Sequence, residues 1–560
     1  MVGWGKVMNY SAATMDGKSI QRTKIAVPAG FETHSEFLED MREDYADAFG
    51  FDEHNISAGR EDAEFIVGKQ WDERVEQRRK DKQKPVLTNN RLVAFVAQIV
   101  NNRLMNETEI RVHPDKDGSK DIAKIRQGII RHIYKNSMAD LARDEAHKYQ
   151  VIGGQGAFCL SIEYTDNDVF EQKISLKPLA DPYAAIFDPS GIEPSGGDCE
   201  YAFVGEDIPL KEYRKRWPNA SETSFEGSWD KDGFWKDVDT VRIVYYWRMV
   251  TEGYKTLALL QDGTTQDVSD IEEYEYLPFV ETRSDGTPYT REVPNRFARL
   301  YICSGNEILE GPFDYPMSSL PVYRVPGWEV NDGRKIHRWG LIRFLKDPQR
   351  LHNYWRSVLA EQLIAAPRNK WLTTPDAVKG HEKRWRASPS SDDPFLYYND
   401  GETLPTHIPP PGVDAALINE AGMATQDLKD ISNIHEASLG MPSNEVSKVA
   451  IQQRQSVSDV GSYIYVDRLR LADERCAKNI NELIPTVYDT KRIETIMGDD
   501  DKPVTAVLND PSDPNSDVTL GKYGVTVSVG PATATKRQLA AESMMAFVNA
   551  VPASAEKVMD

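Results

Sequence analysis

The longest uninterrupted helical stretch limits most strongly how this chain can fold. After the breakers at 440–442, Ser443 or Asn444 can cap a new helix, and apart from Gly461 no breaker follows before Pro485. At 1.5 Å per residue such a helix is on the order of 60 Å long. It is therefore long enough to cross a whole domain.

The first third of the chain is also predicted to be mainly helical. Polar helical stretches cover Glu36–Phe49 and Ala63–Lys80, and apolar residues recur at helical spacing from Leu92 to Asn106. Residues 1–34 precede them and show no clear period, so we expect them to form an arm.

Isoleucines at helical spacing from Ile122 mark a further helix. We expect its apolar stripe to continue through Met138 and Leu141 to an end near Gly153–Gly154. The glycine-rich sequence 153–156 lacks the Lys-Ser/Thr pair of a phosphate-binding loop, and it stands after a helix and before a strand, which is the wrong order for one. We interpret it as a structural turn.

Alternating apolar and polar residues then predict a small sheet with two hairpins. The alternation is expected at 157–164 and 174–187, with turns at 181–182 and 188–189, and the hairpins at 241–250 with 255–261 and at 299–304 with 307–311.

The second half of the chain returns to helices. A short helix is expected at Asp267–Tyr276, and Gly333 is expected to open a long helix that ends before Pro367 and is kinked by Pro348. A second helical block covers Asp414–Leu439. After the very long helix, strands are predicted at 492–497, 504–508 and 523–529, and a helix at 536–548.

Composition excludes several classes of protein. With 67 Lys plus Arg against 88 Asp plus Glu, the net charge of −21 argues against coating of nucleic acid or anionic membrane by bulk attraction. The longest apolar run, Leu92–Val100, is about half of the ~20 residues that a membrane span needs, so we expect no membrane insertion. Reduced, mostly buried thiols are expected at Cys159, Cys199, Cys303 and Cys476, which are widely scattered.

Motifs for catalysis, cofactors and metals are not evident. His435-Glu436 has no second His at the spacing of a zinc helix. The carboxylates at 499–501 and at Asp510, Asp513 and Asp517 lack the pattern of a calcium loop, and we interpret them as solvated turns. One alternative stays open, a metal-dependent nuclease that uses these carboxylates, including Asp500.

A basic stripe on the helix predicted from Gly333 stands out in this acidic chain. Part of it could face phosphate, while the alternative for any one residue is a solvated face or a salt bridge to an acidic neighbour. Its members are Lys335, Arg338, Arg343, Lys346, Arg350 and Arg356.

Several short segments occur in an order typical of one family. They are Gln-Trp-Asp at 70–72, Asn-Asn-Arg at 89–91, Asp-Pro at 181–182 and 188–189, residues 321–328 leading into Lys-Asp-Pro-Gln-Arg-Leu-His-Asn at 346–353, Ala-Ser-Leu-Gly-Met at 437–441, Val-Gly-Pro at 529–531 and Lys-Arg-Gln at 536–538. From about Gln70 to nearly its end, the chain thus resembles the portal proteins of short-tailed, double-stranded-DNA bacteriophages.

The resemblance implies a dodecameric ring at one capsid vertex, through which double-stranded DNA is packaged and later ejected. A separate terminase ATPase would supply the energy, and terminase and then a head-to-tail adaptor would dock on the ring. Further implied partners are the major capsid and scaffolding proteins. The protein would be assembled in the host cytoplasm and would reside in the virion, with no enzyme activity of its own.

The expected fold is α+β, predominantly helical, with wing, stem, clip and crown regions around a central channel. By the resemblance, 1–34 is an N-terminal arm, 35–265 wing, 266–278 the first stem helix, 279–332 clip, 333–366 the second stem helix, 367–489 wing with a tunnel loop at 439–450 and a long spine helix, and 490–560 the start of the crown.

Candidate site residues follow from these regions. The DNA-channel candidates are Lys335, Arg338, Arg343 and Lys346 on the stem and Met441, Pro442, Ser443, Asn444 and Lys448 in the tunnel loop. The candidates for contact with terminase or adaptor in the clip are Arg283, Asp285, Tyr289, Arg291 and Arg296. The competing hypothesis is another ring-forming virion structural or adaptor protein without a DNA channel.

Overall fold

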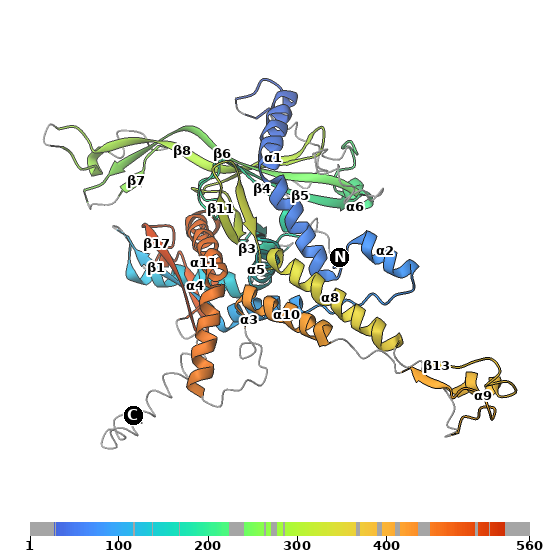
Figure 1. Cartoon of the computed structure of the whole chain (residues 1–560). Coiled ribbons are helices and arrows are strands. Elements are labelled where there is room, and N and C mark those ends of the chain that lie inside the picture. Colours follow the sequence, from blue (N-terminus) through green and yellow to red (C-terminus); the bar gives the residue numbers. More distant parts are fainter. Residues whose placement is uncertain are drawn as a thin grey trace, which may run out of the picture. The chain divides into compact units, whose positions relative to one another are not determined.

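The computed structural model contains two compact units, each built from helices and strands (Figure 1). It describes residues 27–28, 30–115, 118–136, 138–166, 169–222, 240–261, 265–269, 271, 277–283, 286–365, 370–388, 395–408, 415–434, 448–498, 502–513 and 516–531. The first unit comprises Met1–Glu61, Gln98–Gly340 and Ser462–Asp560, and the second comprises Asp62–Ala97 and Leu341–Gly461.

An antiparallel six-stranded sheet forms one part of the first unit. Its order is β4-β5-β6-β8-β9, with β7 paired to β6. The strands are β4 (Ala185–Phe187), β5 (Tyr201–Pro209), β6 (Thr240–Leu259), β7 (Thr265–Asp267), β8 (Thr290–Cys303) and β9 (Ile308–Tyr315). The predicted hairpin around Gly305–Asn306 is confirmed as the connection between β8 and β9.

The other predicted hairpin, 241–250 with 255–261, is wrong. These residues form one strand, β6, which pairs with β8 on both sides of a bulge between Thr251 and Tyr254. Gly253 sits in the bulge with φ +70°, a conformation that serves a bulge as well as a turn. The same local signal therefore fits both structures, and pairing with β8 decides between them.

A second sheet in the first unit has the order β10-β2-β3, where β2 is Gln155–Tyr164, β3 is Gln172–Pro178 and β10 is Val322–Pro326. Helix α5 (Ala139–Gly153) packs on it. Both sheets contribute to one contiguous apolar core, in which Leu160, Trp247 and Tyr323 are almost fully buried.

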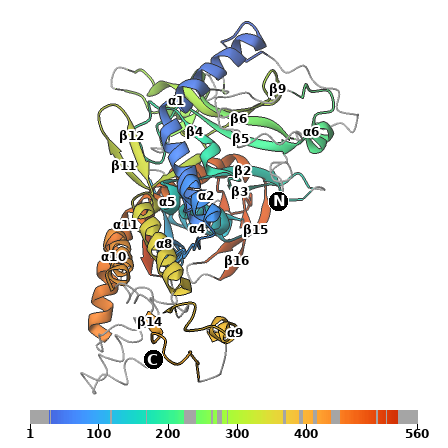
Figure 2. The ribbon, with the colours of Figure 1, turned by 45° about the vertical axis from the view of Figure 1, so that its right-hand side comes forward.

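Two smaller sheets pack against α4 (Lys120–Asn136) (Figure 2). One pairs β1 (Asn106–Pro114) with β17 (Tyr523–Pro531), and the other pairs β15 (Arg492–Met497) with β16 (Pro503–Leu508). The three C-terminal strands expected from the sequence are thus confirmed.

The very long helix is confirmed as α11 (Lys448–Val487), with 40 residues and Pro485 near its end. Its apolar side, including Leu469, Cys476 and Ile480, enters the core of the first unit. All four cysteines are buried, as expected. The helix predicted at 536–548 lies outside the described residues, and so does nearly all of the N-terminal arm.

The N-terminal helices differ from the prediction in where they break. α1 (His34–Val67) runs without interruption for 34 residues, whereas two helices were expected; α2 (Glu73–Asp81) follows and α3 (Leu92–Met105) is confirmed. Gly59 lies inside α1 and does not end the helix. A Cβ at this position would stand 2.6 Å from the Tyr183 ring, so the glycine permits close packing of the helix.

The isoleucine helix, by contrast, is two helices, α4 and α5. Met138 and Leu141 do not continue its buried stripe, because they are 51% and 45% exposed. Met138 occupies the N-cap of α5, where a new helix begins. The buried side chains of α5 therefore do not follow the spacing of those on α4.

The helices predicted at 333–366 and at 266–278 differ from the structure. Residues 328–339 form a hairpin, β11 (Trp328–Asn331) with β12 (Ile336–Trp339), and Gly333 lies in its turn with φ +86°. The helix begins only at α8 (Ile342–Ala365), which contains Pro348. The expected helix 266–278 is contradicted at its start, where β7 pairs with β6; residues 270 and 272–276 lie outside the described part.

The second unit contains two helices that pack side by side, α8 and α10 (Ala415–Ser432) (Figure 1). Between them the chain makes a small excursion with β13 (Lys370–Leu372), α9 (Glu382–Ala387) and β14 (Thr406–Ile408). Helix α2 belongs to the same unit, and Asp72 caps it by accepting hydrogen bonds from Arg74 N and Val75 N.

The glycine-rich sequence 153–156 is a helix-to-strand turn. Gly154 ends α5 with φ +86°, a conformation that favours glycine. Gly156, the second residue of β2, lies so close to α5 that a Cβ there would stand 1.8 Å from Ala146 O. The glycines therefore serve chain reversal and close packing.

We predict that Gly156→Ala lowers the free energy of unfolding by about 1–3 kcal/mol, because backbone must move to admit the methyl group. Gly50→Ala is the matched control, since nothing lies within 4 Å of a Cβ at this helical position. It should raise stability by up to ~1 kcal/mol. Urea unfolding of both variants checks this, and equal effects would contradict the packing argument.

Candidate nucleic-acid interface

The predicted basic stripe is not one stripe in the structure. Lys335 lies in the β11–β12 turn and Arg338 on β12, both in the first unit, whereas Arg343 and Lys346 lie on α8 in the second unit. The expectation that all of them share one helix is therefore wrong. The apolar residues after Gly333 mimic helical spacing, but a turn at this glycine permits a hairpin.

Arg338 is a buried structural residue. Its side chain is 3% exposed, with Nη1 2.5 Å from Asp52 Oδ1 and Nε 2.8 Å from Glu329 Oε1. Burial opposes the charged form, but Asp52 and Glu329 outweigh it and raise the pKa of Arg338. Its charge is thus neutralised within the unit, which removes Arg338 from the channel candidates.

Arg343 and Lys346 share one carboxylate. Arg343 Nε lies 2.9 Å from Asp62 Oδ2, and Lys346 Nζ lies 2.7 Å from Asp62 Oδ1. Asp62 is fully buried, and this burial raises its pKa against the opposing effect of the two cations. Lys346 is itself buried, so it is not a channel-facing residue in this structure.

Lys335 alone of the four has an exposed side chain and no ion pair within the described residues. In the tunnel loop, Met441, Pro442, Ser443 and Asn444 lie outside those residues, and Lys448 is the first residue of α11.

Of the clip candidates, Arg291 and Arg296 lie on β8 of the six-stranded sheet, and Arg283 and Tyr289 lie in the segment before it. Strands β8 and β9 in the range 279–332 are continuous with the sheet of the first unit. Arg283 stacks 4.9 Å from the centre of the Tyr289 ring, Arg291 lies on β8, and Arg296 Nη2 lies 2.7 Å from Glu200 Oε1. Asp285 lies outside the described residues.

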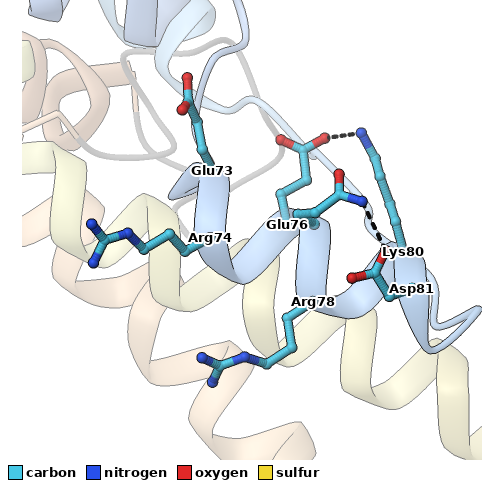
Figure 3. A pocket seen from close by; sticks show the side chains of 7 residues that line it. Glu73, Arg74, Glu76, Arg78, Lys80 and Asp81 are labelled. Atoms are coloured by element: carbon cyan, nitrogen blue, oxygen red, sulfur yellow. Dashed lines mark hydrogen bonds and ion pairs between the residues drawn. The ribbon is translucent and has the colours of Figure 1, made fainter.

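Sequence reasoning missed a pair of exposed cations on α2. Figure 3 shows Arg74 and Arg78 extending from one side of the helix, away from the contacts Glu76–Lys80 and Gln77–Asp81. Neither arginine has an ion pair in the described part of the chain. The signal was present, because residues 74–84 carry six basic and two acidic side chains.

Metal chemistry finds no support in the part of the chain that the structure describes. No group of three or more His, Cys, Asp or Glu there could hold a metal ion. Asp510 Oδ2 lies 2.9 Å from Lys491 Nζ in a surface turn, and residues 499–501 fall outside the described ranges. Among the described helices, none is long and apolar enough to cross a membrane.

We predict that Arg338→Met destabilises the protein by about 3–5 kcal/mol, because the buried carboxylate of Asp52 and the half-buried carboxylate of Glu329 would both lose their cation. Arg296→Met is the control. It breaks an ion pair whose side chains are 45% and 57% exposed, so it should cost less than about 1 kcal/mol. Comparable losses in urea unfolding would show that Arg338 is not structural.

Comparisons with known proteins extend over most of the chain. A family model described as Phage P22-like portal protein matches residues 42–560. A relative named "Portal protein" from Acyrthosiphon pisum secondary endosymbiont phage 1 is 26% identical over 487 residues, which cover 80% of this chain. The chain spans 66% of that relative's length. With its family match from residue 42 to 560, the chain belongs to the Phage P22-like portal protein family.

Proposed function

We propose that this chain is the subunit of a portal ring at one vertex of a phage capsid, through which double-stranded DNA is packaged and ejected. The observation that carries the proposal is the family match over residues 42–560. Twelve copies, docking of terminase and then of a head-to-tail adaptor, contacts with capsid and scaffolding proteins, and assembly in the host cytoplasm are parts of it. The proposal assigns no catalytic residue and no cofactor.

The charge of the chain suits a conduit. Each phosphate contact releases counterions and deepens a binding well, so a wall rich in cations would hold DNA. This chain has a net charge of −21, and Arg338, Arg343 and Lys346 are paired with its own carboxylates. A wall that is negative on balance, with few unpaired cations, lets a duplex slide.

We assign the stem and clip differently from the first expectation. α8 and α10 would be the two stem helices, and the excursion between them would be the clip. The support is the order of the described elements: α8, the small excursion, α10 and, beyond residues 435–447, the very long α11. The family resemblance implies stem, clip and stem in this order, and later the tunnel loop and the spine helix; the stretch of wing expected from 367 to the tunnel loop has no place in this assignment. The tunnel loop stays at 439–450, the wing would be the sheet-bearing first unit, and the crown would start near residue 490.

Native mass spectrometry followed by single-particle imaging of the same sample tests the proposal. The expected result is a ring of about twelve copies with a central hole wide enough for a duplex. A ring without a hole would favour an adaptor or other structural protein. A monomer with divalent-metal-dependent DNA cleavage that is lost in Asp500→Ala would replace the proposal by a nuclease.

A second prediction concerns Arg74 and Arg78, which we propose as sparse phosphate contacts of the channel. Arg74→Gln with Arg78→Gln should leave the ring intact but reduce the DNA that particles retain on heating. Lys211→Gln with Lys215→Gln is the matched control, because these exposed cations stand at the same spacing on α6 (Leu210–Arg216) of the first unit. Equal retention in the two double variants would refute this role.

A further inference from the structure

Helix α2 is not held in place by apolar packing. Its nine residues include one apolar side chain, that of Val75, which is 37% exposed, and Arg79 is the only one of the nine that is buried. A helix this short is marginal on its own, because most helical stability in proteins comes from packing of an apolar face. The proposed phosphate contacts on this helix, Arg74 and Arg78 (Figure 3), therefore depend on another support.

A polar stripe on α8 provides this support. Its members lie on one face of the helix because they recur at every fourth position, as Gln349, Asn353, Ser357 and Glu361. The first three are at most 1% exposed. Buried polar side chains need hydrogen-bond partners, and these three find partners in the chain that flanks α2.

The stripe binds the backbone of residues 84–91, which connect α2 to α3 and form neither helix nor strand. Alternate amides each donate to one member: Leu87 N to Ser357 Oγ at 2.9 Å, Asn89 N to Asn353 Oδ1 at 3.0 Å, and Arg91 N to Gln349 Oε1 at 3.3 Å. Four residues of helix rise about 6 Å, and two residues of extended chain advance about 6.6 Å. The two repeats therefore match along the stripe, and these three contacts do not depend on which side chains the segment carries.

The last member of the stripe reaches α2 itself. Glu361 Oε2 lies 3.3 Å from Arg79 Nη2, and Glu361 Oε1 lies 2.7 Å from Lys84 Nζ. Arg79 Nε also donates to Pro85 O at 3.1 Å, and its guanidinium lies 5.6 Å from the centre of the Tyr354 ring on α8. The one buried side chain of α2 is thus bound by α8 and by the segment that α8 holds.

The other end of α2 is joined to the same stripe. Asn353 Nδ2 donates to Gln70 Oε1 at 2.7 Å, two residues before the N-cap of α2. Three of the short segments that stand out in the sequence, 70–72, 89–91 and 346–353, therefore meet at this place. Their buried amide side chains form one hydrogen-bonded network around the support of α2.

We propose that the buried members of the polar stripe are positioning residues, which fix α2 through residues 84–91 and so hold Arg74 and Arg78 ready for phosphate. The inference rests on the proposed role of these two arginines in the channel and adds what sets their position. A cation on a loosely held helix must be ordered each time it binds, and this cost weakens the contact. A helix that is fixed at both ends keeps its position as successive phosphates pass.

Hydrogen exchange with mass spectrometry on the full chain, without DNA, tests whether the stripe holds α2. Ser357→Ala removes the acceptor of Leu87 N, and Asn353→Leu removes the acceptor of Asn89 N. In both variants, amides of residues 73–91 should exchange at least about tenfold faster than in the wild type, whereas those of α5 in the first unit should not change.

Gln426→Leu is the control for this measurement, because its exposed side chain donates to Asp430 on the same helix, α10. It should leave the exchange of residues 73–91 unchanged. Wild-type exchange of these residues in both stripe variants would overturn the inference, whatever the DNA contact does. A uniform increase over the whole chain would show general destabilisation and would overturn it as well.

Retained DNA tests whether the stripe acts through the arginines. Ser357→Ala with Asn353→Leu should reduce the DNA that assembled particles retain on heating, as is expected of Arg74→Gln with Arg78→Gln. All four substitutions together should lower retention no further, because effects that act through one contact do not add. Losses that add would show a separate structural role and would overturn the inference. Wild-type retention in the arginine variant would refute the channel contact and the inference with it, whereas wild-type retention in the stripe variant alone would overturn only the inference.

Discussion

The buried pair of Arg143 on α5 and Asp473 on α11 is the interaction on which the first unit most depends. Arg143 Nε lies 2.8 Å from Asp473 Oδ1 and its Nη2 lies 2.6 Å from Oδ2, with side chains 5% and 1% exposed. Burial opposes the charge, but Asp473 outweighs it and raises the pKa of Arg143. Tyr134 also donates to Asp473 O, so α4 is joined to the same point. One helix register thus satisfies all three partners.

Further along α11, polar groups fix the sheet in the same way. Arg475 donates to Ser195 O at 2.5 Å and to Leu320 O at 2.6 Å, and Asn479 Nδ2 donates to Tyr323 Oη at 3.0 Å. The Arg475 contacts supply donors to two loop carbonyls, and Ser195 O also accepts from Arg324 N. The very long helix therefore forms an apolar wall of the core and also fixes the loop between β4 and β5 and the loop before β10.

Elements set by local signals were predictable, and those set by distant partners were not. α11 follows from the lack of breakers before Pro485, and β15 to β17 follow from alternation bounded by turns. β6 was mistaken for a hairpin because Gly253 fits a turn as well as a bulge, and only β8 distinguishes them. The pairing of the basic site residues was not predictable for the same reason, because Arg338 pairs with Asp52, which lies 286 positions away in the sequence. Arg74 and Arg78, by contrast, stand in a basic run that composition alone could have singled out.

The negative charge of the chain is favourable on a surface that DNA slides past and unfavourable on a surface that contacts another copy. A conduit benefits from it, but copies at −21 each also repel one another. The Debye length is about 8 Å at physiological salt, so this repulsion acts mainly where surfaces nearly touch. Contacts between copies must therefore offer apolar area, at roughly 25 cal/mol per Å² buried, or charges of both signs. The excursion between α8 and α10 exposes both kinds of group, the apolar Leu372 and Leu404 and the charged Lys383 and Asp400. In the proposed ring, apolar contacts of this kind offset the repulsion that the net charge of each copy creates.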